Sequence, residues 1–193
     1  MKKVFSVDGI EDNSFNDIGN HIYDNLKPIF DDNRTVIFLC IGSDRCTGDS
    51  LGPLVGHHLK HIKSKKIHVY GSLEYPVHSQ NLQETLDKIN DNFNEPYIIA
   101  IDASLGSFHN IGKIFIENTP LFPGLALDKN LPPVGDLSIT GIVNVSGKFE
   151  FMVLQNTRLY TVNTIAENIA KGISYSINKL LCSDINLTQG FRS

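Results

Sequence analysis

Two almost uninterrupted apolar runs constrain the fold of this chain more than any other feature. They cover residues 35–41 (TVIFLCI) and 97–101 (YIIAI). A strand with one face in water alternates apolar and polar residues, whereas a strand inside a parallel sheet is covered on both faces and reads as continuous apolar sequence. The two runs therefore predict central strands of a parallel sheet that has helices on both faces.

Segments with helical periodicity alternate with these runs. Apolar residues recur at intervals of three and four positions, which predicts helices over residues 14–29, 51–63, 80–93 and 160–181. Shorter apolar segments predict further strands over residues 67–70, 113–116 and 149–155. This alternation predicts an α/β fold, a three-layer α/β/α sandwich with a mostly parallel sheet of about five strands.

The length of 193 residues suits one domain with a sizeable core. No linker or internal repeat interrupts the pattern, so we expect a single domain over residues 1–193. Within it, residues 1–34 are predicted to form an N-terminal helical extension and residues 182–193 a tail. Residues 118–147 are rich in proline and glycine and lack periodicity. Long irregular segments of this kind are often lids or binding loops.

Composition excludes several classes of function. The net charge is −4 and the basic residues are scattered, so the basic surface that nucleic-acid binding needs is missing. No apolar run approaches the roughly 18 residues of a membrane span. The N-terminus lacks the apolar core of a signal peptide. An odd number of cysteines, three, indicates reduced thiols. We therefore expect a cytoplasmic protein with no nucleic-acid or membrane partner.

Two aspartates follow the two apolar runs. Asp49 lies in the loop 41–53, between a predicted strand and a predicted helix, and Asp102 comes directly after residues 97–101. If the first strand lies beside the third, as in flavodoxin-like sheets, both carboxylates flank the switch point where α/β sheets place binding sites. Such a pair could share a proton or hold a metal ion and its water. Alternatively, Asp49 could cap the following helix and Asp102 could bind loop amides.

The loop before Asp49 does not match a phosphate-binding motif. Five residues separate Gly42 from Gly48, whereas a P-loop has four residues between its glycines and then a lysine. Asp49 stands where the lysine would, and a carboxylate there would repel phosphate.

Other residues near this loop are candidates for substrate binding or catalysis. Arg45 could orient a substrate carboxylate or balance neighbouring acids, and Ser50 follows Asp49 directly. His78 opens the crevice side of the helix over residues 80–93. Cys46 is an alternative nucleophile.

Three segments resemble the sporulation proteins of the YyaC type: residues 40–56 (CIGSDRCTGDSLGPLVG), 99–104 (IAIDAS) and 152–159 (MVLQNTRL). The resemblance covers roughly residues 35–181. These proteins are similar to the spore germination protease, which degrades small acid-soluble spore proteins, and more remotely to the hydrogenase maturation peptidases. The resemblance implies a hydrogenase-maturation-peptidase-like fold, a protein or peptide substrate, and a place in the cytoplasm of a sporulating bacterial cell.

The same resemblance bears on the site residues. In the germination protease, an aspartate two positions before Leu-Gly-Pro and another after an apolar strand are held to be catalytic, and they match Asp49 and Asp102. The hydrogenase peptidases keep acids at both positions and add a histidine from a later loop to bind nickel. The comparable stretch here, residues 131–136 (LPPVGD), has no histidine and offers Asp136 instead. We therefore expect no metal and no cofactor, with Asp136 as a candidate third carboxylate.

The leading hypothesis is a hydrolase of the endopeptidase type in which Asp49 and Asp102 share the tasks of general acid and base. Its rival is a non-catalytic sporulation protein with the same scaffold that binds a protein partner. The two acids are compatible with both. A metal-dependent maturation peptidase is disfavoured by the missing histidine.

Overall fold

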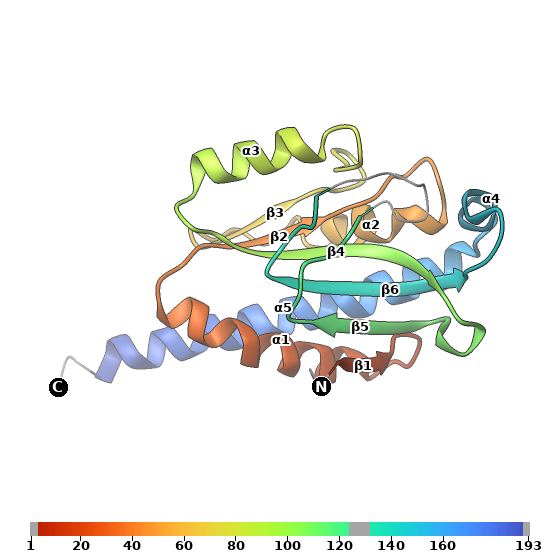
Figure 1. The fold of residues 1–193 in the computed structure, drawn as a ribbon. Coiled ribbons are helices and arrows are strands. Elements are labelled where there is room, and N and C mark those ends of the chain that lie inside the picture. Colours follow the sequence, from red (N-terminus) through yellow and green to blue (C-terminus); the bar gives the residue numbers. More distant parts are fainter. Residues whose placement is uncertain (1–3, 124–131, 191–193) are drawn as a thin grey trace.

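A computed structural model describes residues 4–123 and 132–190 of the chain (Figure 1). Within these residues, six strands form one sheet in the order β1-β5-β6-β4-β2-β3. The strands are β1 (Phe5–Asp8), β2 (Val36–Cys40), β3 (Ile67–Tyr70), β4 (Tyr97–Gly106), β5 (Lys113–Glu117) and β6 (Leu137–Val145). The pairs β2–β3, β2–β4 and β4–β6 are parallel, whereas β5 runs antiparallel to both β1 and β6. The predicted neighbours β2 and β4 do lie side by side.

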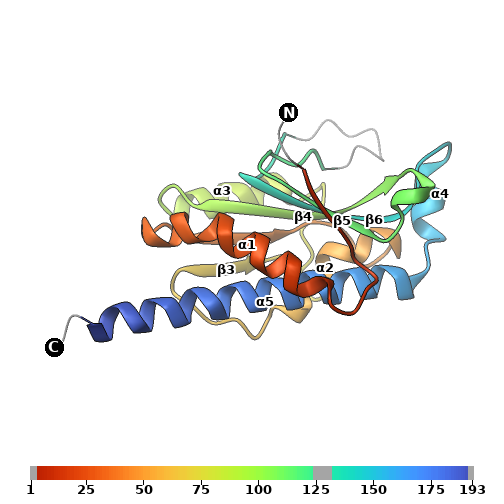
Figure 2. The same ribbon diagram turned by 90° about the horizontal axis from the view of Figure 1, so that it is seen from below.

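Helices cover both faces of the sheet, which confirms the three-layer α/β/α prediction. They are α1 (Ser14–Asp31), α2 (Leu51–His58), α3 (Leu82–Asn92), α4 (Glu150–Gln155) and α5 (Leu159–Gly190), with short 3-10 turns η1 (Gly48–Ser50) and η2 (Phe108–Asn110). Helices α1, α2 and α5 lie on one face and α3 lies on the other (Figures 1 and 2). None of the helices in the described part of the chain is long and apolar enough to cross a membrane.

The pleat of β2 explains its uninterrupted apolar sequence. Successive side chains of a strand point to opposite faces. Val36, Phe38 and Cys40 pack into the cluster with α1, α2 and α5, whereas Ile37 and Leu39 pack into the cluster with α3. All five side chains are fully buried. Because each large apolar side chain contributes roughly 1.5–3 kcal/mol when it is buried, both faces of this strand stabilise the fold.

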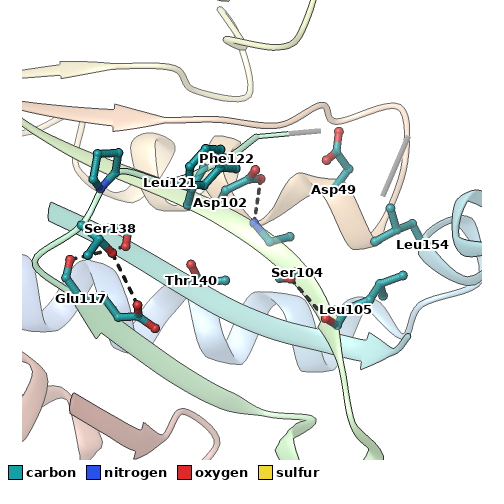
Figure 3. A pocket seen from close by; sticks show the side chains of 13 residues that line it. Asp49, Asp102, Ser104, Leu105, Glu117, Leu121, Phe122, Ser138, Thr140 and Leu154 are labelled. Carbon is teal, nitrogen blue, oxygen red and sulfur yellow. Dashed lines mark hydrogen bonds between the residues drawn. The ribbon is translucent and has the colours of Figure 1, made fainter. Parts of the chain in front are cut away.

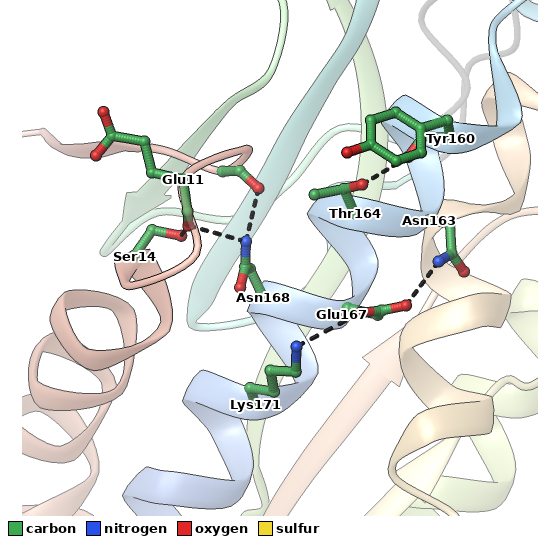
Figure 4. A network of polar contacts seen from close by, with 9 residues as sticks. Glu11, Ser14, Tyr160, Asn163, Thr164, Glu167, Asn168 and Lys171 are labelled. Carbon is green, nitrogen blue, oxygen red and sulfur yellow. Dashed lines mark hydrogen bonds and ion pairs between the residues drawn. The ribbon is translucent and has the colours of Figure 1, made fainter.

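The described part of the N-terminal segment packs onto the rest of the domain: β1 joins the sheet and α1, which contains the helix expected over residues 14–29, contributes to the core. β1 pairs with β5 along the edge of the sheet. The side-chain amide of Asn168 on α5, which is only 3% exposed, donates hydrogen bonds to the carbonyls of Gly9 (2.9 Å) and Glu11 (3.2 Å). The Ser14 hydroxyl donates to the same Glu11 carbonyl at 2.8 Å (Figure 4). These bonds tie the turn between β1 and α1 to the long C-terminal helix.

Three elements differ from the prediction. The segment 118–147, predicted to be irregular, contains β6, which inserts between β5 and β4. The segment 149–155, predicted to be a strand, contains α4 (Glu150–Gln155), with Phe149 at the N-cap. The last helix continues to Gly190, through much of the predicted tail. Residues 124–131, within the segment predicted to be irregular, lie outside the described residues.

The sequences of β6 and α4 explain these errors. β6 reads LSITGIVNV, in which serine, threonine and glycine interrupt the apolar residues. Its strand character depends on pairing with β4 and β5 rather than on local sequence. The segment over residues 149–155 is a short apolar run, which periodicity cannot assign to strand or helix. Phe151 and Met152 are 52% and 59% exposed, as on a surface helix.

Candidate functional site

The loop between β2 and α2 holds Asp49 at the carboxyl end of the sheet. Gly42 has φ 142°, a conformation that favours glycine, and a Cβ atom there would collide with the Asp49 carbonyl oxygen. That oxygen accepts a hydrogen bond from the Ser43 amide at 3.0 Å. A Cβ atom on Gly52 would collide with the Ile41 carbonyl. The two glycines therefore let the loop close tightly on the start of α2 and position the Asp49 backbone.

Asp102 lies inside β4, which corrects the prediction that the strand ends at Ile101. Pairing with β2 does end at Ile101, but pairing with β6 continues to Gly106. The Asp102 side chain lies on the face of the sheet that carries α3, and only 8% of the residue is exposed. Its Oδ1 atom accepts a hydrogen bond from the Ala103 amide at 2.7 Å. Beyond Ile101, β4 is paired with β6 but not with β2, and this one-sided pairing leaves room beside the Asp102 carboxyl group.

Asp49 and Asp102 together line two adjoining cavities. The first, the β6-side cavity, has a volume of about 240 Å³ and extends towards Glu117, Ser138 and Thr140. The second, the loop-side cavity, has a volume of about 390 Å³, and its lining residues include Ser43, Arg45, Cys46, His78 and Phe151. Figure 3 shows Glu117 and Ser138 on one side of Asp102, and Asp49 and Leu154 on the other. The two acids therefore lie where the cavities meet.

The surroundings of Asp102 favour its protonated form. Burial raises the pKa of this carboxyl group well above its usual range, and the negative charge of Asp49 raises the pKa further. The hydrogen bond from the Ala103 amide opposes both effects. Asp49 is half-buried and lies closer to solvent than Asp102. The arrangement suits a protonated carboxyl group beside a carboxylate, which is the state that acid–base chemistry needs.

The structure brings Arg45 and His78 to this site and leaves Ser50 and Asp136 away from it. Arg45 and His78 line the loop-side cavity, and Nδ1 of His78 accepts a hydrogen bond from the Gln80 amide at 3.3 Å. The buried Ser50 hydroxyl donates to the Thr47 carbonyl at 2.7 Å and lines neither cavity. Ser50, rather than Asp49, occupies the N-cap position of α2.

Asp136 supports the sheet rather than the acid pair. Its Oδ2 atom accepts a hydrogen bond from the Ile98 amide at 2.8 Å, near the amino end of β4. Asp102 lies four residues further along the same strand, about 13 Å away at the rise of an extended chain. The structure therefore places Asp136 away from the acid pair, outside the lining of both cavities.

Cys46 is disfavoured as a nucleophile. It lines the loop-side cavity, but burial raises the pKa of its thiol. The charge of Asp49 raises that pKa further, against backbone hydrogen bonds that lower it. Reactive cysteines need a lowered pKa, because the thiolate is the nucleophile.

The donor set does not fit a transition-metal centre of the hydrogenase-peptidase kind. The sequence contains no histidine after His109, so no later loop can supply that ligand. Among residues 4–123 and 132–190, no group of three His, Cys, Asp or Glu side chains could hold a metal ion. Nickel and zinc sites usually contain nitrogen or sulfur ligands. His78 and Cys46 line the same cavity as the two carboxylates, but no three of these described side chains are grouped so that they could hold an ion.

Sequence reasoning missed the residues of the β6-side cavity. Ser138 and Thr140 lie on β6, a strand that was not predicted, and Glu117 lies one position past the predicted strand over residues 113–116. A signal for Glu117 is present in the sequence KIFIE. Ile114 and Ile116 point into the core, so Phe115 and Glu117 must face the other side of the sheet.

Comparisons with known proteins place the chain in a family. The [NiFe] hydrogenase maturation protease HycI from Thermococcus kodakarensis KOD1 is similar in structure, with a TM-score of 0.46 and 20% sequence identity over 78% of this chain and 99% of that chain. "Uncharacterized protein YyaC" from Bacillus subtilis (strain 168) is 48% identical over 141 residues, which are 73% of this chain and 69% of the relative. This identity confirms the resemblance to the YyaC type. The family described as "Protein of unknown function (DUF1256)" matches residues 7–172, and the chain belongs to this family.

Proposed function

We propose that this protein is a hydrolase of the endopeptidase type, similar to the germination protease, that cleaves protein or peptide substrates with Asp49 and Asp102. One observation carries the proposal. Asp102 is a buried carboxyl group with a raised pKa, and it meets Asp49 at the junction of two cavities. The match of both aspartates to the germination-protease pattern supports the same conclusion.

In the first step, the Asp49 carboxylate accepts a proton from a water molecule, and the water oxygen attacks the carbonyl carbon of the scissile peptide bond. Protonated Asp102 donates its proton to the carbonyl oxygen, which gives a neutral tetrahedral diol. Asp49 is then protonated and Asp102 is ionised. The more exposed position of Asp49 suits the base, and the burial of Asp102 suits the acid.

In the second step, Asp49 donates its proton to the amide nitrogen, and the carbon–nitrogen bond breaks. Asp102 accepts a proton from a diol hydroxyl as the carboxylic acid product forms. Both aspartates thereby return to their starting states. The cavities on either side of the pair leave space for substrate on both sides of the scissile bond.

The test is to incubate the purified chain with spore protein extract and with a mixed peptide library, and to identify fragments by mass spectrometry. General acid–base catalysis typically contributes about 10²–10⁴-fold, so Asp49→Asn and Asp102→Asn should each lower the cleavage rate by that factor. Asp44→Asn is the matched control, because Asp44 is an exposed acid of the same loop and lines neither cavity.

Cleavage that survives both substitutions would contradict the acid-pair mechanism. A protein that binds substrate with one-to-one stoichiometry but releases no fragments would support the rival function, a non-catalytic protein that binds a partner.

A further inference from the structure

The charge of the β6-side cavity differs from that of its neighbour. Among the residues that the structure describes, thirteen line this cavity; they include three acids, Asp49, Asp102 and Glu117, and no lysine, arginine or histidine. The loop-side cavity shares the two aspartates but adds Arg45 and His78. A cationic group is therefore better accommodated on the Glu117 side of the acid pair than on the other.

The register of the sheet fixes the separation between Glu117 and Asp102. In the sheet register, Glu117 on β5 pairs with Ser138 on β6, and Asp102 on β4 pairs with Thr140. Glu117 is thus two strands across and two residues back, which places the two Cα atoms roughly 12 Å apart. A long side chain that starts near the acid pair can bridge much of this distance.

The cavity lining between Asp102 and Glu117 suits a side chain with an apolar stem and a polar head. Leu121 and Phe122 contribute apolar surface, and Phe122 is 58% exposed. The Ser138 hydroxyl donates its proton to the Glu117 carbonyl at 3.4 Å, so its oxygen can accept a further bond. The Glu117 carboxylate accepts a weak bond from the Thr119 hydroxyl at 3.4 Å and has remaining acceptor sites.

We propose that the β6-side cavity binds the side chain of a lysine or arginine that flanks the scissile bond, with Glu117 as the specificity-determining residue. The aliphatic stem would lie along Leu121 and Phe122, and the cationic head would pair with the Glu117 carboxylate. The position of this side chain next to a cleaved bond rests on the proposed function. Recognition of the side chain is a binding property, and it can be measured without cleavage.

The test uses the full chain with Asp102→Asn, which blocks the proposed chemistry and mimics a protonated carboxyl group. Binding of peptide libraries with one position held as Lys, Met or Glu is measured by isothermal calorimetry. The lysine library should bind about tenfold tighter or more than the methionine library, the typical effect of a hydrogen bond to a charged group. Adding Glu117→Gln should remove that difference, and adding Glu117→Lys should shift the preference to the glutamate library.

Asp91→Asn is the matched control, because it also removes one negative charge, from an exposed position on α3. It should leave the lysine preference unchanged. Equal binding of the lysine and methionine libraries, or a lysine preference that survives Glu117→Gln, would overturn the inference. Lysine-selective binding by the Asp102→Asn chain, combined with no cleavage of the same peptides by the native chain, would support the recognition and contradict the hydrolase, so the two failures are distinguishable.

Discussion

The face of the sheet that packs against α1, α2 and α5 differs in chemistry from the face that holds Asp102. On β4, Ile101 packs into the helical cluster and its neighbour Asp102 lines the cavities. On β6, Ile139 is fully buried in that cluster and its neighbour Thr140 lines the β6-side cavity. A shift of one residue along either strand therefore exchanges a core position for a cavity position.

Incomplete cover explains the difference between the faces. α3 lies over the side of the sheet formed by β2 and β3, where Ile37, Leu39 and Leu82 form an apolar cluster (Figure 1). At the ends of β4 and β6 the short helix α4 lies beside the sheet, where its Leu154 lines the β6-side cavity and its Phe151 lines the loop-side cavity (Figure 1). Polar side chains are tolerated there because they face cavities rather than a packed helix. On β4 and β6, the packed core and the cavities therefore lie on opposite faces of the same strands.

The largest effect is expected from adjacent substitutions on β6. Ile139→Ala should lower the free energy of unfolding by about 2–5 kcal/mol, because it leaves a cavity among fully buried side chains. Thr140→Ala, one residue further, should cost less than about 1 kcal/mol, because its side chain lines an open cavity. Urea unfolding of both variants is the measurement. Similar decreases in the free energy of unfolding for the two variants would contradict the difference between the two faces of β6.

A smaller effect concerns Asp102 and pH. Its raised pKa means that the folded state binds a proton more tightly than the unfolded state. The stabilisation is complete below the unfolded pKa of about 4 and is lost as pH rises through the raised pKa. Asp102→Asn removes this dependence, so the variant should gain stability relative to the native chain as pH increases. Urea midpoints measured between about pH 4 and about pH 8 test the sign.

A stability advantage of Asp102→Asn that shrinks with rising pH would indicate an ionised Asp102 held by favourable contacts. That outcome would remove the basis for assigning Asp102 as the acid.

The smallest effect is expected at Asp136. Asp136→Asn weakens a hydrogen bond to the Ile98 amide, so it should lower the free energy of unfolding by about 0.5–1.5 kcal/mol. Substrate cleavage should continue at the native rate, because this side chain lines neither cavity. Thermal melting and turnover of the same preparation provide the comparison. A large loss of cleavage activity with unchanged stability would indicate that Asp136 takes part in cleavage.

Local sequence determined the central part of the fold and the identity of the two acids. The run over residues 35–41 predicts β2, because burial on both faces requires apolar residues at every position, and the helical periodicities predict α1, α2, α3 and α5. The length of the loop before Leu51 and its glycines place Asp49 after β2, and the apolar run before Asp102 places that residue on the neighbouring strand. These features depend on residues that are close together in the chain.

Tertiary structure alone decided which residues line the β6-side cavity together with the two aspartates. β6 exists because its backbone pairs with residues of β4 about 38 positions earlier, such as Ile99 with Leu137, and no local pattern reports that pairing. The same pairing extends β4 past Asp102 and brings Glu117 and Thr140 to one cavity. Backbone hydrogen bonds between distant segments do not depend on side-chain identity, so polar residues can occupy a strand without a sequence signal. The protonation of Asp102 likewise depends on burial by such distant segments, because burial is the largest cause of its raised pKa.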